Sequence, residues 1–256
     1  MATRLFVCAV ILGWTLPTAA TQEPKTANDF YKRGLAWIEK GEFDKAIKDL
    51  DEAVRLNPKL AEAFASRSGL WAEKGEFDKA IKDSDSAIRL DPKLADAFIS
   101  RGLARLGKRE FEKAINDLDQ AIRLNSKDSR SFYNRGVAWT EMGKYDKAIK
   151  DYDETLRLDP KFADALHNRG SAWANKGEFN NAIKDFDELI RLHPKDAGAY
   201  YVRGLAWKAK GDNEKAAKDY AEAKRLRAFC EKLSNPVLTC PDVQMTLRGF
   251  EPRSQP

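Results

Sequence analysis

The sequence has few of the residues and motifs on which enzyme chemistry depends. Two histidines, His167 and His193, and three cysteines occur among 256 residues. No cysteine lies near either histidine in the sequence, so no short stretch supplies a cluster of metal ligands. The chain also lacks a complete Walker phosphate loop, a GxGxxG motif and a GxSxG motif. We therefore predict a protein that is not an enzyme and that holds no metal and no cofactor.

An excess of one charge is also absent, because 45 basic residues stand against 40 acidic ones and the net charge is +5. A nucleic-acid-binding domain would gather its basic residues on one face, so we expect no nucleic-acid partner. No segment alternates polar and apolar residues with the period of two that is typical of a strand. The composition, with 43% hydrophobic residues, nevertheless supports a folded chain, which we predict to be all-α.

The longest apolar run lies within the first 20 residues. Arg4 gives a positive start, Leu5 to Leu16 form the run, and Pro17 is followed by small residues. This layout is typical of a secretory signal peptide, here residues 1–20. The run is too short for a membrane span, which needs about 20 residues, although an uncleaved anchor is the alternative. We predict export to the periplasm or beyond, a mature chain that starts near Thr21, and no membrane span after signal removal.

The dominant feature of the sequence is a repeat. Residues 29–58, DFYKRGLAWIEKGEFDKAIKDLDEAVRLNP, return in similar form at 63–92, 131–160 and 165–194, with weaker copies from Ala97 and Ala199. A fixed period of this length predicts an array of stacked units. After a polar lead-in at 21–26 we place six units of 34 residues, and a tail at 231–256 follows them. The units are 27–60, 61–94, 95–128, 129–162, 163–196 and 197–230.

Each unit contains two helical patterns. In the first unit, one helix is expected from Ala27 to about Lys40, because its bulky residues recur at helical spacing and Gly41 ends it. The second helix is expected to begin near Phe43 and to stop at Asn57, because Pro58 disfavours a helical conformation in the residue before it.

Position by position, the unit resembles a tetratricopeptide repeat. The matching residues of the first unit are Phe30, Gly34, Trp37, Ala46, Leu50, Ala53 and Pro58. The resemblance covers about four-fifths of the chain and implies a right-handed α-solenoid of helix-turn-helix repeats. It also assigns the recurring tryptophans to the core (Trp37, Trp71, Trp139, Trp173 and Trp207).

Three units depart from the repeat pattern. The sixth has Asn213 for the turn aromatic and Ala217 for isoleucine, as terminal units often do. The second has Ser68 for glycine and Ser84 for a bulky residue, so we expect it to pack less tightly. The third has Arg105 for tryptophan and Arg109 for the turn glycine. We expect Gly107 to shift that turn or to fray the helix before it.

The charged residues form a lattice. Each unit has an arginine at its seventh position (Arg33, Arg67, Arg101, Arg135, Arg169 and Arg203) and an aspartate at its twenty-third. We predict that each arginine pairs with an aspartate of its own or the adjoining unit, forming a ladder. The alternative is that these arginines grip an anionic partner. Pairs four residues apart, such as Asp51–Arg55 and Asp44–Lys48, are expected to stabilise the helix surface by about 0.2–0.5 kcal/mol each.

The resemblance also implies a function. First helices of this family line a concave groove, and the corresponding residues here are the partner-groove candidates. They are Tyr31, Leu35, Ile38, Ile99, Leu103, Tyr133, Val137, His167, Tyr201 and Leu205. The lysine and asparagine that clamp a peptide carboxylate in some members are missing from these positions. We expect a protein–protein interaction scaffold of the bacterial envelope that binds a peptide or helix with apolar anchors.

Three alternatives to groove binding are open. The protein can be a structural or assembly subunit of an envelope complex, in which the convex face and the tail matter more than the groove. It can bind cell-wall carbohydrate through Tyr31, Tyr133 and Tyr201. The candidate residues can also merely complete the solenoid surface.

The third cysteine, Cys8, belongs to the signal, and Cys230 and Cys240 remain. In an exported protein they can form a disulfide that fastens the tail, worth about 2–3 kcal/mol for such a short loop. Two free thiols are the alternative.

Overall fold

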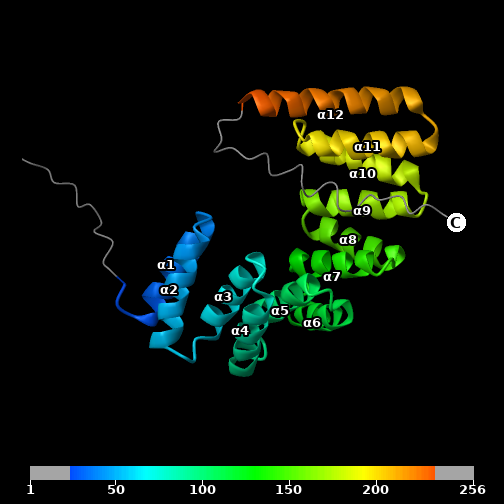
Figure 1. The fold of residues 1–256 in the computed structure, drawn as a ribbon. Coiled ribbons are helices and arrows are strands. Elements are labelled where there is room, and N and C mark those ends of the chain that lie inside the picture. The colour runs from blue at the N-terminus through cyan, green and yellow to red at the C-terminus, as the bar shows by residue number, and fades with distance from the viewer. Residues whose placement is uncertain (1–23, 234–256) are drawn as a thin grey trace, which may run out of the picture.

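The computed structural model describes residues 24–233, with side chains as far as residue 228. This part of the chain contains twelve α-helices and no strand (Figure 1), which confirms the all-α prediction. The helices are α1 (Ala27–Glu39), α2 (Phe43–Leu56), α3 (Ala61–Glu73), α4 (Phe77–Leu90), α5 (Ala95–Gly107), α6 (Phe111–Leu124), α7 (Ser129–Glu141), α8 (Tyr145–Leu158), α9 (Ala163–Asn175), α10 (Phe179–Leu192), α11 (Ala197–Lys210) and α12 (Asn213–Leu233).

The helices pack as consecutive pairs, each made of an odd-numbered first helix and an even-numbered second helix. Pairs follow one another along a curved path from α1 and α2 to α11 and α12 (Figure 1). First helices of neighbouring pairs touch one another from α3 onward, whereas second helices of neighbouring pairs show no comparable contact. The first helices therefore line the inner side of the curve, and the fold is a helical repeat solenoid.

The turn between the two helices of a pair needs a residue in the left-handed conformation. Five pairs place glycine there, as at Gly41 with φ 72°, because glycine has no Cβ to clash. The third pair instead has Arg109 with φ 60°, and α5 has the same length as α1, α3, α7 and α9. The expectation that Gly107 shifts this turn or frays the helix is wrong, because Arg109 adopts the glycine conformation. Gly107 lies beneath the Phe77 ring, whose nearest atom is 2.2 Å from where a Cβ would stand.

Close approach within a pair depends on small residues facing large ones. At Gly136, a Cβ would lie 2.7 Å from the ring of Tyr152, which is fully buried. The second pair has a small residue on both sides of this contact. Ser68 and Ser84 are both fully buried, their hydroxyls lie 2.5 Å apart, and Ser68 donates to the Ala80 carbonyl. The expected looser packing is not found, since the two serines fill and satisfy the contact together.

The predicted signal peptide (1–20), most of the lead-in and the tail beyond residue 233 lie outside the described residues. The same holds for the Cys230–Cys240 disulfide, because α12 includes the backbone of Cys230 but not a described side chain. Within residues 24–233, no helix combines the length and apolar character that a membrane crossing requires.

Candidate functional site

The arginine–aspartate ladder connects the first helices with the second helices along the array. Within each pair, the seventh-position arginine donates from Nε and Nη2 to both oxygens of the aspartate sixteen residues later, as Arg67 does to Asp83. From the second pair onward, Nη1 of the same arginine also binds an aspartate of the preceding pair, as Arg67 binds Asp51 at 2.7 Å. Each of these guanidinium groups therefore bridges two pairs, which confirms the predicted ladder.

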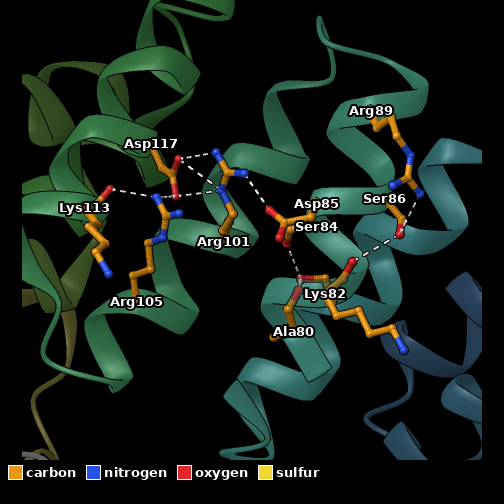
Figure 2. A network of polar contacts seen from close by, with 11 residues as sticks. Ala80, Lys82, Ser84, Asp85, Ser86, Arg89, Arg101, Arg105, Lys113 and Asp117 are labelled. Carbon is orange, nitrogen blue, oxygen red and sulfur yellow. Dashed lines mark hydrogen bonds and ion pairs between the residues drawn. The ribbon is translucent and has the colours of Figure 1, made fainter. Parts of the chain in front are cut away.

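In Figure 2, Arg101 lies between Asp85 of the preceding pair and Asp117 of its own, with 2.7 Å contacts to each. The ladder also ends where the array ends. The second helices α2, α4, α6, α8 and α10 supply a bridging aspartate (Asp51, Asp85, Asp119, Asp153 and Asp187). In α12 the corresponding residue is Ala221.

The aspartates that bind the arginine of their own pair are buried, and Asp117 is 3% exposed. Their charge is matched by planar, bidentate guanidinium groups, an arrangement that satisfies both carboxylate oxygens. At the fourth pair, the hydrogen bond to Asp151 raises the pKa of Arg135. The guanidinium donors are therefore used inside the protein, and the ladder belongs to the packing of the array. This geometry gives no support to the alternative in which these arginines grip an anionic partner.

An indole completes the aspartate site in the first pair. Trp37 donates from Nε1 to Asp49 at 3.0 Å, and Lys40 and Lys45 lie over its ring. In the third pair Arg105 replaces the tryptophan and donates to Asp117 at 2.7 Å (Figure 2). Arg105 therefore makes the same hydrogen bond as the tryptophan at this position of the first pair, but with a charged guanidinium group in place of an indole ring.

The predicted surface pairs four residues apart are wrong in detail. Asp51 binds Arg67 of the next pair, and Arg55 binds Glu52 three residues earlier. Asp44 likewise binds Lys74 of the next pair and not Lys48. The pairing differs because a stacked neighbour offers these carboxylates a partner that a single helix cannot show.

The inner face is closed between the second and third pairs. Helix α3 carries small residues at Ala65, Gly69 and Ala72, and α3 and α5 contact each other far more extensively than other neighbouring first helices do. Ser100 of α5 donates to the Ala65 carbonyl at 3.3 Å. Its hydroxyl lies 3.6 Å from where a Gly69 Cβ would stand. Small side chains on α3 therefore let α5 pack directly against it.

This closure removes one candidate from the surface. Ile99 is 3% exposed, so its assignment to an accessible groove is wrong. The reason is the direct packing of α5 against α3, which leaves no groove beside Ile99.

Larger side chains separate the inner helices in the C-terminal half. Tyr133 of α7 stacks on Phe162 with ring centroids 4.8 Å apart, and its hydroxyl accepts from Asn168 at 3.1 Å. His167 of α9 packs against Phe186, and burial lowers its pKa. Tyr133 fills the space between the fourth and fifth pairs, and α7, α9 and α11 touch each other sparingly.

The other candidates keep accessible surface to different degrees. Leu35 of α1 is 36% exposed. Six are half-buried, and they belong to α1, α5, α7 and α11 (Tyr31, Ile38, Leu103, Val137, Tyr201 and Leu205). The structure thus spreads the candidates along the inner face and does not gather them into one compact site.

A cleft that the sequence reasoning missed lies beside α11 and α12. It has a volume of about 410 Å³ and is lined by Tyr201, Tyr220, Ala223, Lys224, Arg227 and Ala228. One signal in the sequence marks it. Lys224 stands where the other second helices have an aliphatic residue, such as Leu156 of α8. No set of three or more metal-ligating side chains comes together in the described part of the chain.

The solved structures that resemble this fold are repeat proteins. A crystal structure of MamA is 25% identical with a TM-score of 0.60, covering 63% of this chain and 95% of its own. PilF of Pseudomonas aeruginosa is 21% identical with a TM-score of 0.68, covering 78% and 91%. YrrB, described as a tetratricopeptide protein with an unusual peptide-binding site, is 21% identical with a TM-score of 0.58, covering 77% and 95%.

No curated protein sequence gives a significant match. Family models do match, and all four are described as tetratricopeptide repeat. They cover residues 27–60, 95–128, 129–162 and 174–229, which together are more than half of the chain. Tetratricopeptide proteins are in general scaffolds that bind other proteins and carry out no chemistry themselves. The helix pairs, the matched models and the similar structures agree, and the chain belongs to the tetratricopeptide repeat family.

Proposed function

We propose that this protein is a non-enzymatic scaffold that binds a peptide or a short helix of a partner protein on the inner face of α7, α9 and α11. One observation carries the proposal. The inner helices of the C-terminal half touch each other sparingly, whereas α3 and α5 are packed together. A partner segment can therefore contact α7, α9 and α11, while the face between α3 and α5 is already occupied by the protein itself.

The side chains on this face fit a segment with apolar anchors and exposed backbone groups. Val137 and Leu205 are half-buried and offer apolar surface. Thr140 and Asn168 lie on the same helices and hydrogen-bond to tyrosine hydroxyls, at 3.0 and 3.1 Å. An apolar surface flanked by amide and hydroxyl groups is suited to extended peptides and amphipathic helices.

The place of action that we propose is the cell envelope of a bacterium, in the periplasm or outside the cell. The support is the signal-like sequence at residues 1–20. A structural or assembly subunit of an envelope complex is the second candidate. The support for it is a row of exposed leucines on second helices of the first three pairs (Leu56, Leu90 and Leu124), which offers a different apolar surface.

The experiment compares inner and outer faces with matched substitutions. Chain expressed without residues 1–20 is used to capture partners by crosslinking from a periplasmic extract, with the single variants Val137→Lys and Leu205→Lys. A lysine at a half-buried site can keep its stem packed and its charge in water, and circular dichroism checks that helicity is kept. The control is Leu124→Lys, since Leu124 is 39% exposed on α6.

We expect capture to be lost with the two inner-face variants and kept with Leu124→Lys. Capture that survives both inner-face variants but fails with Leu124→Lys would overturn groove binding in favour of the assembly role.

A further inference from the structure

In each earlier pair, one face is covered by the pair that follows it. The last pair has no such cover among the described residues. In the fourth pair this face includes Tyr133 and Tyr152. It is covered by α9 and by the residue before it, Phe162, whose ring stacks on Tyr133. Tyr152 is fully buried as a result. The stacking of each pair on the next is what buries the apolar side of a repeat unit.

Tyr201 and Tyr220 occupy the same places in α11 and α12, with ring centroids 5.7 Å apart. No helix beyond α12 is present in the described residues, and the cleft of about 410 Å³ lies where the next first helix would pack. Tyr220 is half-buried, unlike Tyr152. The array thus ends on an apolar, aromatic surface that lacks a cover among residues 24–233.

Two cations distinguish this surface from the earlier ones. The corresponding second helices have Val54, Ile88, Ile122, Leu156 and Ile190 where α12 has Lys224. One turn later Arg227 lies over the Tyr201 ring, 5.8 Å from its centroid. Its Nε is buried and has no hydrogen-bond partner in the described structure. A buried donor of this kind calls for an acceptor, so the surface fits a segment that is apolar and carries an acidic group.

Such a segment follows α12 directly. Residues 234–247, SNPVLTCPDVQMTL, carry a single charged residue, Asp242, and then the alternating apolar residues Val243, Met245 and Leu247. Arg227 lies six residues before Leu233, where α12 ends, which is about 9 Å along a helix. The segment can span about 3.3 Å per residue when extended, so it reaches back to the cleft with length to spare.

We propose that residues 237–247 fold back over α11 and α12, place Val243 and Met245 on the tyrosines of the cleft, and bring Asp242 to Lys224 and Arg227. The tail then closes the array in place of a seventh unit. It also competes with any protein that approaches the C-terminal end, a second copy of this chain included.

The test is hydrogen–deuterium exchange of the full chain, expressed without residues 1–20 and kept in reductant so that no disulfide contributes to protection. The variant is Asp242→Asn, and the matched control is Glu251→Gln, which removes the other acidic side chain beyond residue 233. Losing one hydrogen bond between charged groups is expected to speed exchange in α11 around Tyr201 and in α12 by about tenfold. The control is expected to exchange like the parent.

Two further measurements keep the proposal falsifiable. Arg227→Gln is expected to speed exchange as Asp242→Asn does, and the double variant to add little, because both remove one interaction. A synthetic peptide of residues 234–250 is expected to bind a chain that ends at residue 233, and its Asp242→Asn form to bind about tenfold more weakly. Unchanged exchange in Asp242→Asn, or no binding by the peptide, overturns the proposal even if the inner face binds a partner.

Discussion

The inner face is closed between α3 and α5 and open along α7, α9 and α11, although one 34-residue pattern builds both regions. In α3 the inner residues are Ala65 and Gly69, and α5 packs directly against them. In α7 the equivalent residues are Tyr133 and Val137. The large Tyr133 side chain stacks on Phe162 and accepts a hydrogen bond from Asn168, and it lies between α7 and α9. The residues that line the groove therefore also set how open it is.

The ladder, by contrast, is the same in both halves. Each arginine from Arg67 to Arg203 bridges a buried aspartate of its own pair and an exposed aspartate of the preceding pair. Its geometry is unaffected by whether the inner helices touch. The constant part of the repeat thus fixes the stacking, and the variable part shapes the surface.

The largest expected effect is the same in the two halves. Asp83→Ala and Asp185→Ala each remove a buried carboxylate and leave an arginine without its bidentate partner, which is expected to destabilise the fold by about 3–5 kcal/mol. Urea unfolding followed by circular dichroism measures this loss. The control Asp85→Ala removes a carboxylate whose side chain is 54% exposed and is expected to cost about 1 kcal/mol or less. Equal costs for buried and exposed aspartates would contradict the structural role of the ladder.

A second substitution tests the difference in packing between the inner helices α3 and α5 and the inner helices α7 and α9. Gly69→Leu places a side chain where Ser100 approaches α3, and overpacking is expected to cost about 1–3 kcal/mol. The matched change in the open half, Val137→Leu, is expected to cost less than about 1.5 kcal/mol, because the site already holds a similar side chain. Thermal unfolding compares the two variants, and a larger loss for Val137→Leu would be inconsistent with a closed inner face between α3 and α5.

The packing of α9 also predicts a dependence on pH. Burial lowers the pKa of His167 below its ordinary value of 6.5, so the unfolded chain takes up the proton more readily. Stability is then full above about pH 6.5 and falls as the pH is lowered, by up to about 1.4 kcal/mol per pH unit for one proton. His167→Tyr installs the residue found in α7 and α11, and it is expected to flatten melting temperatures between pH 7 and pH 5.5.

The exposed His193 supplies the control for this experiment. His193→Asn should keep the parent slope. A slope that persists in His167→Tyr would show that the protonation of another group is responsible.

The smallest effect concerns the turn of the third pair. Arg109→Gly relieves a left-handed residue with φ 60° and is expected to raise stability by up to about 1 kcal/mol. Arg109→Ala keeps the strained conformation and should show no such gain. If both variants gain equally, the loss of the arginine side chain is the cause and not relief of the backbone.

The sequence was sufficient to predict paired helices in each unit, the bounds of α1 and α2 to within a residue, and the ladder. Those features depend on residues that recur with a fixed period, such as Arg33 and Trp37, and a period can be read without coordinates. The closure at α3 and α5 was not predicted, because it depends on Ala65 and Gly69 facing residues of the next unit. The hydrogen bond from Arg105 to Asp117 was not predicted either, because an arginine at the tryptophan position does not by itself show which acceptor it reaches.

The candidate site was predicted less well than the fold. Family positions identified the inner face, but they did not show that Ile99 is buried or that Tyr133 fills the space between pairs. The terminal cleft was missed because it exists only where a following unit is absent, which a repeat pattern does not show.

The most direct test of this account is a nuclear Overhauser measurement on the isotope-labelled chain. The account predicts contacts between the α-protons of Gly69 and the β-protons of Ser100, where the backbone and the hydroxyl approach closely. It predicts no contact between the α-proton of Val137 and the backbone protons of α9. Absence of the Gly69–Ser100 contact, or equal backbone contacts between α3 and α5 and between α7 and α9, would contradict the claim that inner side chains close the first region and open the second.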